Sequence, residues 1–469
     1  MTSSSATAHA ATQPRADGLP VPRRYWAIAT IILALTMSVL DSTIVNVALP
    51  SLAHDFHTTD AASVWVVNAY QIAILVALLP LASLGEIVGY RRISQCGLAV
   101  FTLASLGCAL APSLTTLSIA RVVQGLGAAG IMSVNSALVR FTYPHRMLGR
   151  AIGINAFSVA VASAIGPTIA SAILAVAQWR WLFAVNVPIG IVTFAIALFA
   201  LPDSERTPRR LNHVGVALQA GTFGLLMVGL QSFAHETMPA LRFAELGGGC
   251  LLAVLLVRHE IDRATPLIPF DLLRIRVFTL SVGTSIGSFM AATAALIAVP
   301  FEIQHLGHSA AETGLLMTPW PAAVAIAAPL AGYLADRHPA GILASIGLLA
   351  MCAGVLLLAF FPHDGSSFGL LWRMALCGLG FGFFQTPNNR TLLNAAPYAR
   401  MGAAGGMLAT ARLLGQTLGA AAVAVLFRAY PVRGSHAVLV VAAAISLLAA
   451  SISASRLAKE PAPESDLQP

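Results

Sequence analysis

Long apolar runs recur along the whole chain and are separated by short polar segments. A helix that rises about 1.5 Å per residue needs about 20 apolar residues to cross a hydrocarbon core about 30 Å thick. Glycine and proline are tolerated inside such runs where neighbouring helices satisfy the backbone groups. The pattern therefore predicts an all-α membrane protein with about fourteen transmembrane helices. They lie at approximately residues 25–48, 62–84, 93–110, 114–139, 148–176, 181–201, 213–233, 243–257, 278–300, 311–334, 341–361, 367–386, 402–427 and 437–455.

The basic residues between these runs predict the orientation of the chain. With the first residue placed in the cytoplasm, roughly twenty arginines and lysines fall in inside loops, as the positive-inside rule requires. The outside loops hold far fewer, namely Arg180, Arg242, Arg373, Arg428 and Arg433. We therefore expect a multi-pass protein of the inner (cytoplasmic) membrane with both termini in the cytoplasm.

Composition supports the membrane assignment. The 469 residues are 57% hydrophobic and only 10% charged, whereas soluble domains carry about 25% charged residues. The net charge of +8 comes from short loops, so it indicates topology and no nucleic-acid partner. The five cysteines stand singly without metal-ligand spacing, which predicts neither a metal site nor a cofactor.

A short internal repeat predicts the domain organisation. Residues 80–86 (PLASLGE) resemble residues 329–336 (PLAGYLAD), each at the cytoplasmic end of a span and each followed by arginine. Two pseudo-symmetric six-helix halves are expected at 25–202 and 278–456, with a substrate site at their interface. Residues 203–277 would be a two-helix insertion with cytoplasmic loops. Residues 1–24 and 457–469 would be cytoplasmic tails, the first of them disordered.

A carboxylate lies deep inside the first apolar run. Asp41 is about 24 Å along a helix from Tyr25, and a charged carboxylate at that depth costs at least about 2.5 kcal/mol. We expect Asp41 to face a polar cavity, a partner charge or a proton. The alternative is an acid placed harmlessly near a helix end.

Arg121 is a candidate partner for Asp41. It lies about 12 Å from the outer start of the fourth span, and both residues fall in the outer half of the membrane. A buried arginine needs a partner, and protonating Asp41 would weaken such a pair, which would couple a proton to transport. The alternative is that Arg121 donates to backbone carbonyls and is only structural.

Other polar and aromatic residues of the spans are candidates for the substrate cavity. Glu302 closes the ninth span and equally fits a solvated position at the interface, whereas Arg412 lies midway along the thirteenth and should face the interior. Residues after the glycine-rich twelfth span would bind substrate or satisfy unwound backbone. The candidates are Tyr70, Gln124, Glu302, Gln385, Asn388 and Arg412.

Several motifs together carry a family resemblance that covers about residues 25–455. They are LDSTIVNVALP at 40–50, GEIVGYRR at 85–92, ARVVQGLGAA at 120–129, GP at 166–167, WRWLF at 179–183 and NVPIG at 186–190. The chain resembles the fourteen-helix drug–proton antiporter family of the major facilitator superfamily. It departs from the usual pattern at Ala82, Glu86, Ala162, Ala170 and Ser171, mostly by exchanging one small residue for another.

The resemblance assigns roles to two groups of residues. Gly166 and Pro167 would form the core of the antiporter motif in the fifth helix. Charged residues and glycines at two corresponding cytoplasmic loops would form a gate that holds one state closed. The gating residues are Gly85, Glu86, Gly89, Arg91, Arg92, Asp336 and Arg337.

These observations predict a proton-coupled secondary transporter that exports hydrophobic, cationic drugs or toxic compounds by alternating access. Lipophilic cations would gain from aromatic side chains in the cavity. The alternative is a proton-coupled exporter of another small molecule, such as a metabolite, an amino acid or a siderophore. An enzyme or an ATP-driven pump is not expected, since neither H-E-x-x-H nor G-x-x-x-x-G-K-[ST] occurs. We expect the protein to act as a monomer in the lipid bilayer.

Overall fold

The computed structural model describes residues 18–144, 147–204, 211–234, 238–261, 263, 269–335, 337–360, 366–397 and 400–456. Within these residues the chain is helical, and fourteen segments are long and apolar enough to cross a membrane. The predicted fold class and helix count are confirmed. The two tails and Asp336 lie outside the described residues, apart from residues 18–24 of the first tail.

The first half contains six spans, two of which are broken into shorter helices. Its helices are α1 (Arg23–Asp55), α2 (Asp60–Ser63), α3 (Trp65–Val88), α4 (Tyr90–Ala109), α5 (Leu114–Thr142), α6 (Leu148–Val176), α7 (Arg180–Ala184) and α8 (Asn186–Ala200). The helix α1 runs past Pro50 to Asp55, beyond the predicted end near residue 48. Proline is compatible with a membrane helix because neighbouring groups satisfy the backbone that it leaves unpaired.

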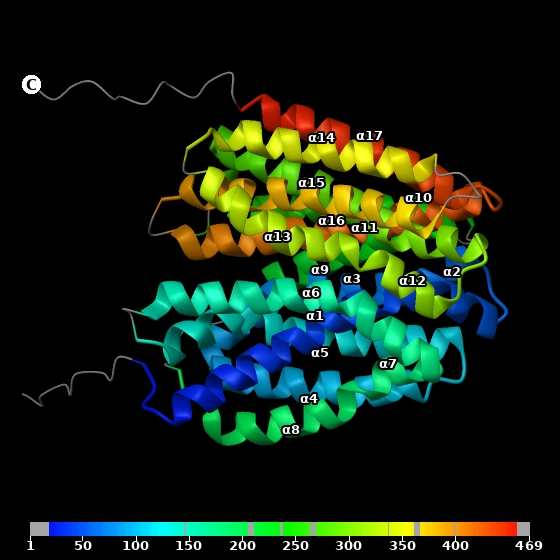
Figure 1. Cartoon of the computed structure of the whole chain (residues 1–469). Helices are drawn as coiled ribbons and strands as arrows, with labels where there is room; N and C mark the ends of the chain where they lie inside the picture. The colour runs from blue at the N-terminus through cyan, green and yellow to red at the C-terminus, as the bar shows by residue number, and fades with distance from the viewer. Residues whose placement is uncertain are drawn as a thin grey trace, which may run out of the picture.

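The second half repeats the first. Its helices are α11 (Arg276–His305), α12 (Ala310–Met317), α13 (Pro319–Leu334), α14 (Ala340–Ala359), α15 (Ser367–Asn394), α16 (Met401–Ala429) and α17 (Gly434–Ala454). The second span is broken at Val64 in one half and at Thr318 in the other. The packing repeats as well, since α3 and α4 pack on α5 as α13 and α14 pack on α15. The two halves form the lower and upper parts of Figure 1.

Glycines allow the helices to approach closely at matching places in the two halves. A Cβ added to Gly97 or Gly127 would meet the facing backbone of α5 or α4, and one added to Gly347 would meet α15 in the same way. Gly125 packs on the carbonyl oxygen of Tyr70, as Gly378 packs on that of Trp320. Small residues are the usual way for membrane helices to pack, because lipid provides no hydrophobic drive for helix association.

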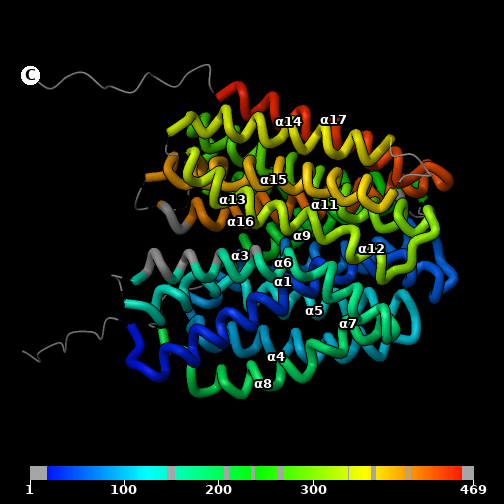
Figure 2. Tube along the Cα trace, viewed as in Figure 1, coloured from blue at the N-terminus to red at the C-terminus, as the bar shows by residue number. Residues whose placement is uncertain are grey.

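The two inserted spans cover the seam between the halves. They are α9 (His213–Gln231), continued by the turn η2 (Ser232–Ala234), and α10 (Pro239–Glu260); the turn η3 (Leu272–Arg274) follows before α11. The helix α9 packs on α10 and also on α3 of the first half and α16 of the second. In the tube view of Figure 2, α9 lies between the two halves.

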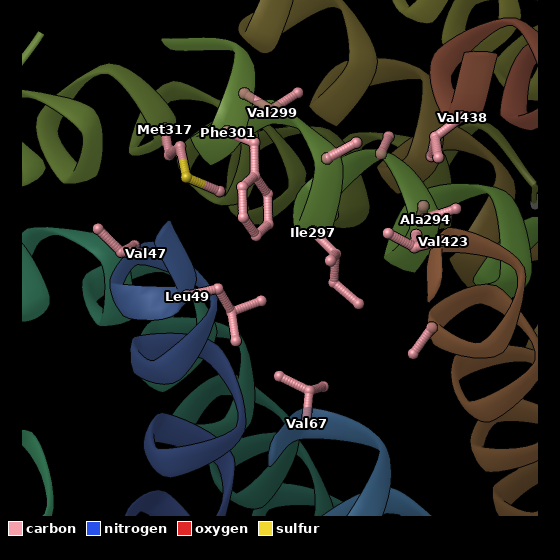
Figure 3. Close-up of a cluster of buried hydrophobic side chains, with 14 of the residues drawn as sticks. Val47, Leu49, Val67, Ala294, Ile297, Val299, Phe301, Met317, Val423 and Val438 are labelled. Atoms are coloured by element: carbon pink, nitrogen blue, oxygen red, sulfur yellow. The ribbon is translucent and has the colours of Figure 1, made fainter. Parts of the chain in front are cut away.

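The halves are joined at one end of the bundle, which we call the far end. The start of α1 and the end of α17 lie at the other end, which we call the tail end (Figure 1). At the far end the side-chain amide of Gln304 donates to the Val47 carbonyl (3.4 Å), and the Thr168 and Thr318 hydroxyls are 2.8 Å apart. Val47, Leu49 and Val67 of the first half belong to the same buried cluster as Ile297 and Phe301 of the second, as Figure 3 shows. The far end is therefore closed by apolar packing between the halves.

Candidate functional site

Asp41 lies near the middle of α1 and is only 2% exposed. It is about 27 Å along the helix from Arg23 and about 21 Å from Asp55, so it sits well inside the membrane. A charge at this depth requires a partner. The structure supplies one from α5.

Arg121 forms an ion pair with Asp41, and each side chain is 1% exposed. The guanidinium Nη1 donates to Asp41 Oδ2 and to Gln124 Oε1, and its Nε donates to the Val66 carbonyl of α3 (3.1 Å). Arg121 therefore makes the predicted charge pair and also the backbone contact of the structural alternative. Opposite charges attract strongly where water is excluded, so this pair is a strong constraint on α1 and α5.

The second carboxylate oxygen of Asp41 is also satisfied. Its Oδ1 accepts from Gln124 Nε2 (2.8 Å) and from Asn186 Nδ2 (3.0 Å), the latter at the start of α8. Gln124 Nε2 also donates to Ser105 Oγ of α4 (2.9 Å). A buried carboxylate is stable only when such donors replace its water. The pair is thus the centre of a network that draws on α1, α3, α4, α5 and α8.

Aromatic rings cover the arginine. The guanidinium carbon of Arg121 lies 4.1 Å from the ring centre of Tyr70 and 5.6 Å from that of Phe183. The Tyr70 hydroxyl donates to the Ser38 carbonyl of α1 (3.0 Å). Tyr70 and Gln124, expected in a substrate cavity, are 1% and 0% exposed. In this conformation they belong to the sealed network of the first half.

The candidates in the second half lie in three separate places. Asn388 is buried near the tail end, where it donates to Ser285 Oγ (2.8 Å) and accepts from Arg456 Nη1 (2.8 Å). Glu302 accepts from Ser435 Oγ (2.6 Å) near the far end. Beside it, a cavity of about 450 Å³ is lined by α2, α11 and the loop between α16 and α17. Gln385 is partly buried in α15.

Arg412 differs from the other buried arginines. It is partly exposed at mid-length of α16, and its guanidinium carbon lies 5.7 Å from the ring centre of Phe289 on α11. Its Nε is buried without a hydrogen-bond partner among the described residues. The predicted depth is confirmed by the bounds of α16.

The predicted gate residues lie at the tail end. Gly89 connects α3 and α4 with φ +110°, a conformation that L side chains rarely adopt. Arg91 Nη1 pairs with Asp203 Oδ1 (3.0 Å), which follows α8 at the start of the insertion. Gly85 packs closely against Tyr90 and Val134. Glu86 is partly buried, Arg92 is exposed, and Arg337 stacks on Tyr333 (4.7 Å).

The predicted antiporter motif lies at contacts made by α6. A Cβ on Gly166 would clash with Thr43 of α1, and one on Gly314 of α12 would clash with the Pro167 carbonyl. One turn on, the Ser171 hydroxyl donates to the Ala311 carbonyl. The motif therefore packs α6 on α1 inside its own half and on α12 across to the other half.

Sequence reasoning missed several polar residues of the spans. Asn186 and Ser105 complete the Asp41 network, although only Asn186 stands in a quoted motif. Asn46, Asn68 and Gln71, on α1 and α3, carry buried side-chain atoms without hydrogen-bond partners among the described residues. Their signal in the sequence is an amide inside an apolar run, which costs free energy if left unpaired.

The described residues show no catalytic or metal-binding arrangement. No group of three His, Cys, Asp or Glu residues in them could hold a metal ion. Residues 283–287 (GTSIG) match G-x-S-x-G, but they lie inside α11, and the Ser285 hydroxyl is 0% exposed and accepts from Asn388. A hydrolase serine stands on a sharp strand-to-helix turn instead.

Comparison with known proteins decides the family. The model of the Major Facilitator Superfamily matches residues 31–420 and 277–468. The chain belongs to the major facilitator superfamily. It is 50% identical to the uncharacterized transporter YebQ of Escherichia coli K12 over 94% of this chain and 98% of that protein. It is 33% identical to the multidrug resistance protein Stp of Mycobacterium tuberculosis over 82% of this chain and 73% of that protein.

A solved structure shows the same fold. A bacterial homologue of the human lysosomal transporter Spinster, crystallised in an inward-facing and unoccupied conformation, superposes with a TM-score of 0.69. The sequences are 16% identical, and the match covers 95% of this chain and 100% of that chain. This chain is therefore a membrane transporter by family, and it shares the fold of that solved structure.

Proposed function

We propose that this chain is a proton-coupled exporter that moves hydrophobic compounds across the inner membrane by alternating access of its two halves. The observation that carries the proposal is the sealed ion pair of Asp41 and Arg121 at membrane depth. Ion pairs in membranes are costly and typically mark proton relays and substrate paths. The relative named as a multidrug resistance protein supports export of drug-like compounds.

The network offers a route from a proton to the two halves. A proton on Asp41 would remove the charge that holds Arg121 and the donors Gln124 and Asn186. The helices α1 and α3, which the network ties together, pack on α11 and α16 of the second half. A change of protonation at Asp41 would therefore bias the packing between the halves.

The closed far end supports alternating access. With both termini in the cytoplasm, as the loop arginines favour, the apolar contacts around Val47 and Phe301 close the outer side. The inner gate would be formed by the loop around Gly89 and its counterpart near Arg337. We propose that the protein works as a monomer, because each half contributes its own face to the seam.

The structure changes the charge that we propose for the substrate. A cationic substrate was expected from an acidic residue and aromatic side chains in the cavity. In this conformation Asp41 is bound by Arg121 and is 2% exposed, so that reason no longer holds. We therefore propose hydrophobic compounds without a fixed positive charge.

The test is transport by purified protein in liposomes with an acidic interior. A trapped pH-sensitive dye would report protons released when a hydrophobic compound such as chloramphenicol is added outside. Wild-type protein should release protons faster than protein-free liposomes, and Asp41→Asn should not. Asp55→Asn is the matched control, since Asp55 lies on the same helix but at the far end, where it accepts from Trp179 and lies 3.5 Å from His54. Equal proton release by wild type and Asp41→Asn would overturn the coupling role, and no release by wild type with any compound would overturn the proposed function.

A further inference from the structure

An arginine without an acidic partner among the described residues lies in the middle of the second half. Arg412 is about 17 Å along α16 from Met401 and about 26 Å from Ala429. This places its charge near the centre of the bilayer, where a cation is costly unless a partner, water or ligand compensates it.

Among the described residues, no carboxylate pairs with Arg412. The described part of the second half contains two acidic residues, Glu302 and Glu312. Glu302 accepts from Ser435 and lies about 20 Å along α11 from Phe289, the residue that Arg412 stacks on. Glu312 caps the start of α12 at the far end.

Other buried arginines show that the fold can satisfy a guanidinium. Arg121 binds Asp41, Gln124 and the Val66 carbonyl. Arg456, at the tail end, donates to Ser281 and Asn388. Among the described residues Arg412 has the ring of Phe289 beside it and no hydrogen-bonding partner. The residue is nevertheless partly exposed.

The helix face that carries Arg412 is turned toward the first half. Gly405, Ala409, Arg412 and Gln416 follow one another at spacings of three and four residues, and therefore share one face of α16. Ala409 packs in the buried cluster of the first half that includes Leu75 and Leu78 of α3. A Cβ on Gly405 would meet no atom within 4 Å. The face is thus in contact at one turn and open at another.

An aromatic group flanks the charge. The Phe289 and Phe381 rings meet edge to face, with centres 5.2 Å apart. A planar guanidinium beside aromatic rings suits a ligand with an oxyanion and an apolar body, because arginine binds carboxylates and sulfonates through paired N–H donors. A cationic ligand would instead be repelled by Arg412.

We propose that Arg412 is the anion-binding residue of the substrate path, and that the substrates are apolar compounds that carry a carboxylate or sulfonate group. This inference rests on the proposed export function, since it assumes that the face of α16 between the halves meets the substrate. The side-chain Nδ2 of Asn68 on α3 is buried without a partner among the described residues, and α3 packs on α16, so Asn68 offers a further donor.

Three naphthalene compounds of matched shape test the inference. Naphthalenesulfonate is permanently anionic, naphthalenesulfonamide is neutral and naphthyltrimethylammonium is permanently cationic. Binding to the purified full-length chain would be measured by tryptophan fluorescence, and transport by proton release from liposomes. Wild type should bind the sulfonate most tightly and the ammonium least. Arg412→Gln should weaken sulfonate binding about tenfold or more, as expected for a lost charge-assisted contact, and change sulfonamide binding by less than about twofold.

Controls separate this inference from general effects. Arg373→Gln removes the same charge from the same half, but Arg373 donates to the Gly369 carbonyl near the far end; it should leave sulfonate binding unchanged. Arg412→Lys keeps the charge and should retain part of the sulfonate binding. If the variants do not fold, the order in which the wild-type protein binds the three compounds decides whether the inference holds. Tighter binding of the ammonium, or unchanged sulfonate binding in folded Arg412→Gln, would overturn the inference while leaving export intact. Arginine-dependent sulfonate binding without proton release would support the inference and count against the proposed function.

Discussion

The side-chain amide of Asn186 donates to Asp41 Oδ1 over 3.0 Å, and thereby ties the start of α8 to the middle of α1. The same oxygen accepts from Gln124. Such donors replace the water that a buried carboxylate loses. Asn186 therefore helps to hold the central acid in its network.

We predict that Asn186→Leu slows proton-driven transport. Leucine cannot donate to Asp41 Oδ1, so the change unties the start of α8 from the central acid. The rate of proton release from liposomes measures the effect. Asn388→Leu would serve as a control, since Asn388 donates within the second half and does not contact Asp41. A wild-type rate in Asn186→Leu would show that this contact is only structural.

The ion pair itself can be tested by a double-mutant cycle. Asp41→Asn leaves the Arg121 charge buried without its partner, which typically costs about 3–5 kcal/mol of stability. Arg121→Gln in the same protein removes that charge, so the double variant should be more stable than Asp41→Asn alone. Thermal unfolding in detergent gives the comparison.

In this double-mutant cycle, proton-driven export should stay lost even where thermal stability recovers. Both variants lack a group at position 41 that can cycle a proton, so both should lose proton-driven export. If the double variant regained export together with its stability, Asp41 would be a folding residue and not a coupling residue.

The sequence could predict those parts of the site that follow from the depth of each residue in the membrane. Asp41 and Arg121 could be paired in advance because helical rise places both in the outer half of the membrane. Asn186 and Ser105 could not, since joining them to Asp41 requires the rotation of α8 and α4 about their axes. That rotation is set by tertiary packing, such as the contact of Gly190 with Thr102.

The same limit explains two differences in the second half. Asn388 was considered for substrate binding, but it is held by Ser285 and by Arg456. Arg456 stands directly after the last predicted span, yet it is only 6% exposed. Its sequence context, at the end of an apolar run, indicates proximity to the membrane surface but not which way the side chain folds. The fourteen spans, by contrast, follow directly from run length and are confirmed.

A comparison of Gly89 with Gly307 can separate a gating role of the loop at Gly89 from the effect of backbone strain. Gly89 has φ +110° and Gly307, in the loop between α11 and α12 at the far end, has φ +91°. A Cβ at either position meets no atom closer than 3.6 Å, so Gly89→Ala and Gly307→Ala introduce similar strain, about 1–3 kcal/mol each. We expect similar losses of thermal stability in the two variants.

Only Gly89→Ala should slow turnover, because only that loop belongs to the proposed inner gate. Its substrate affinity should stay close to wild type, since Gly89 lies away from α16. Rates of proton release at saturating and limiting substrate would distinguish the two effects. Equal slowing by Gly307→Ala would assign the effect to strain and leave the Gly89 loop without a special role.

The last prediction concerns the inserted helices α9 and α10, which should not line the translocation path. Gly224 and Leu252, at mid-membrane, are expected to stay unreactive to a membrane-impermeant thiol reagent when changed to cysteine. The structure gives their surroundings: a Cβ on Gly224 meets no atom within 4 Å, and Leu252 packs against Gly221 between the two helices.

A sharper position is Gln219, because α9 packs on α3 and α16 and Gln219 is 0% exposed. Its amide atoms have no hydrogen-bond partner among the described residues, so it is the residue of α9 that would bind substrate if this helix did. In a background without cysteine, Gln219→Cys should remain unlabelled with or without substrate. Gln416→Cys, on the face of α16 that carries Arg412, should be labelled and protected by the anionic probe. Gln219→Leu should transport at the wild-type rate. Labelling of Gln219→Cys that substrate prevents would place α9 in the path, and the insertion would then share in substrate recognition with α16.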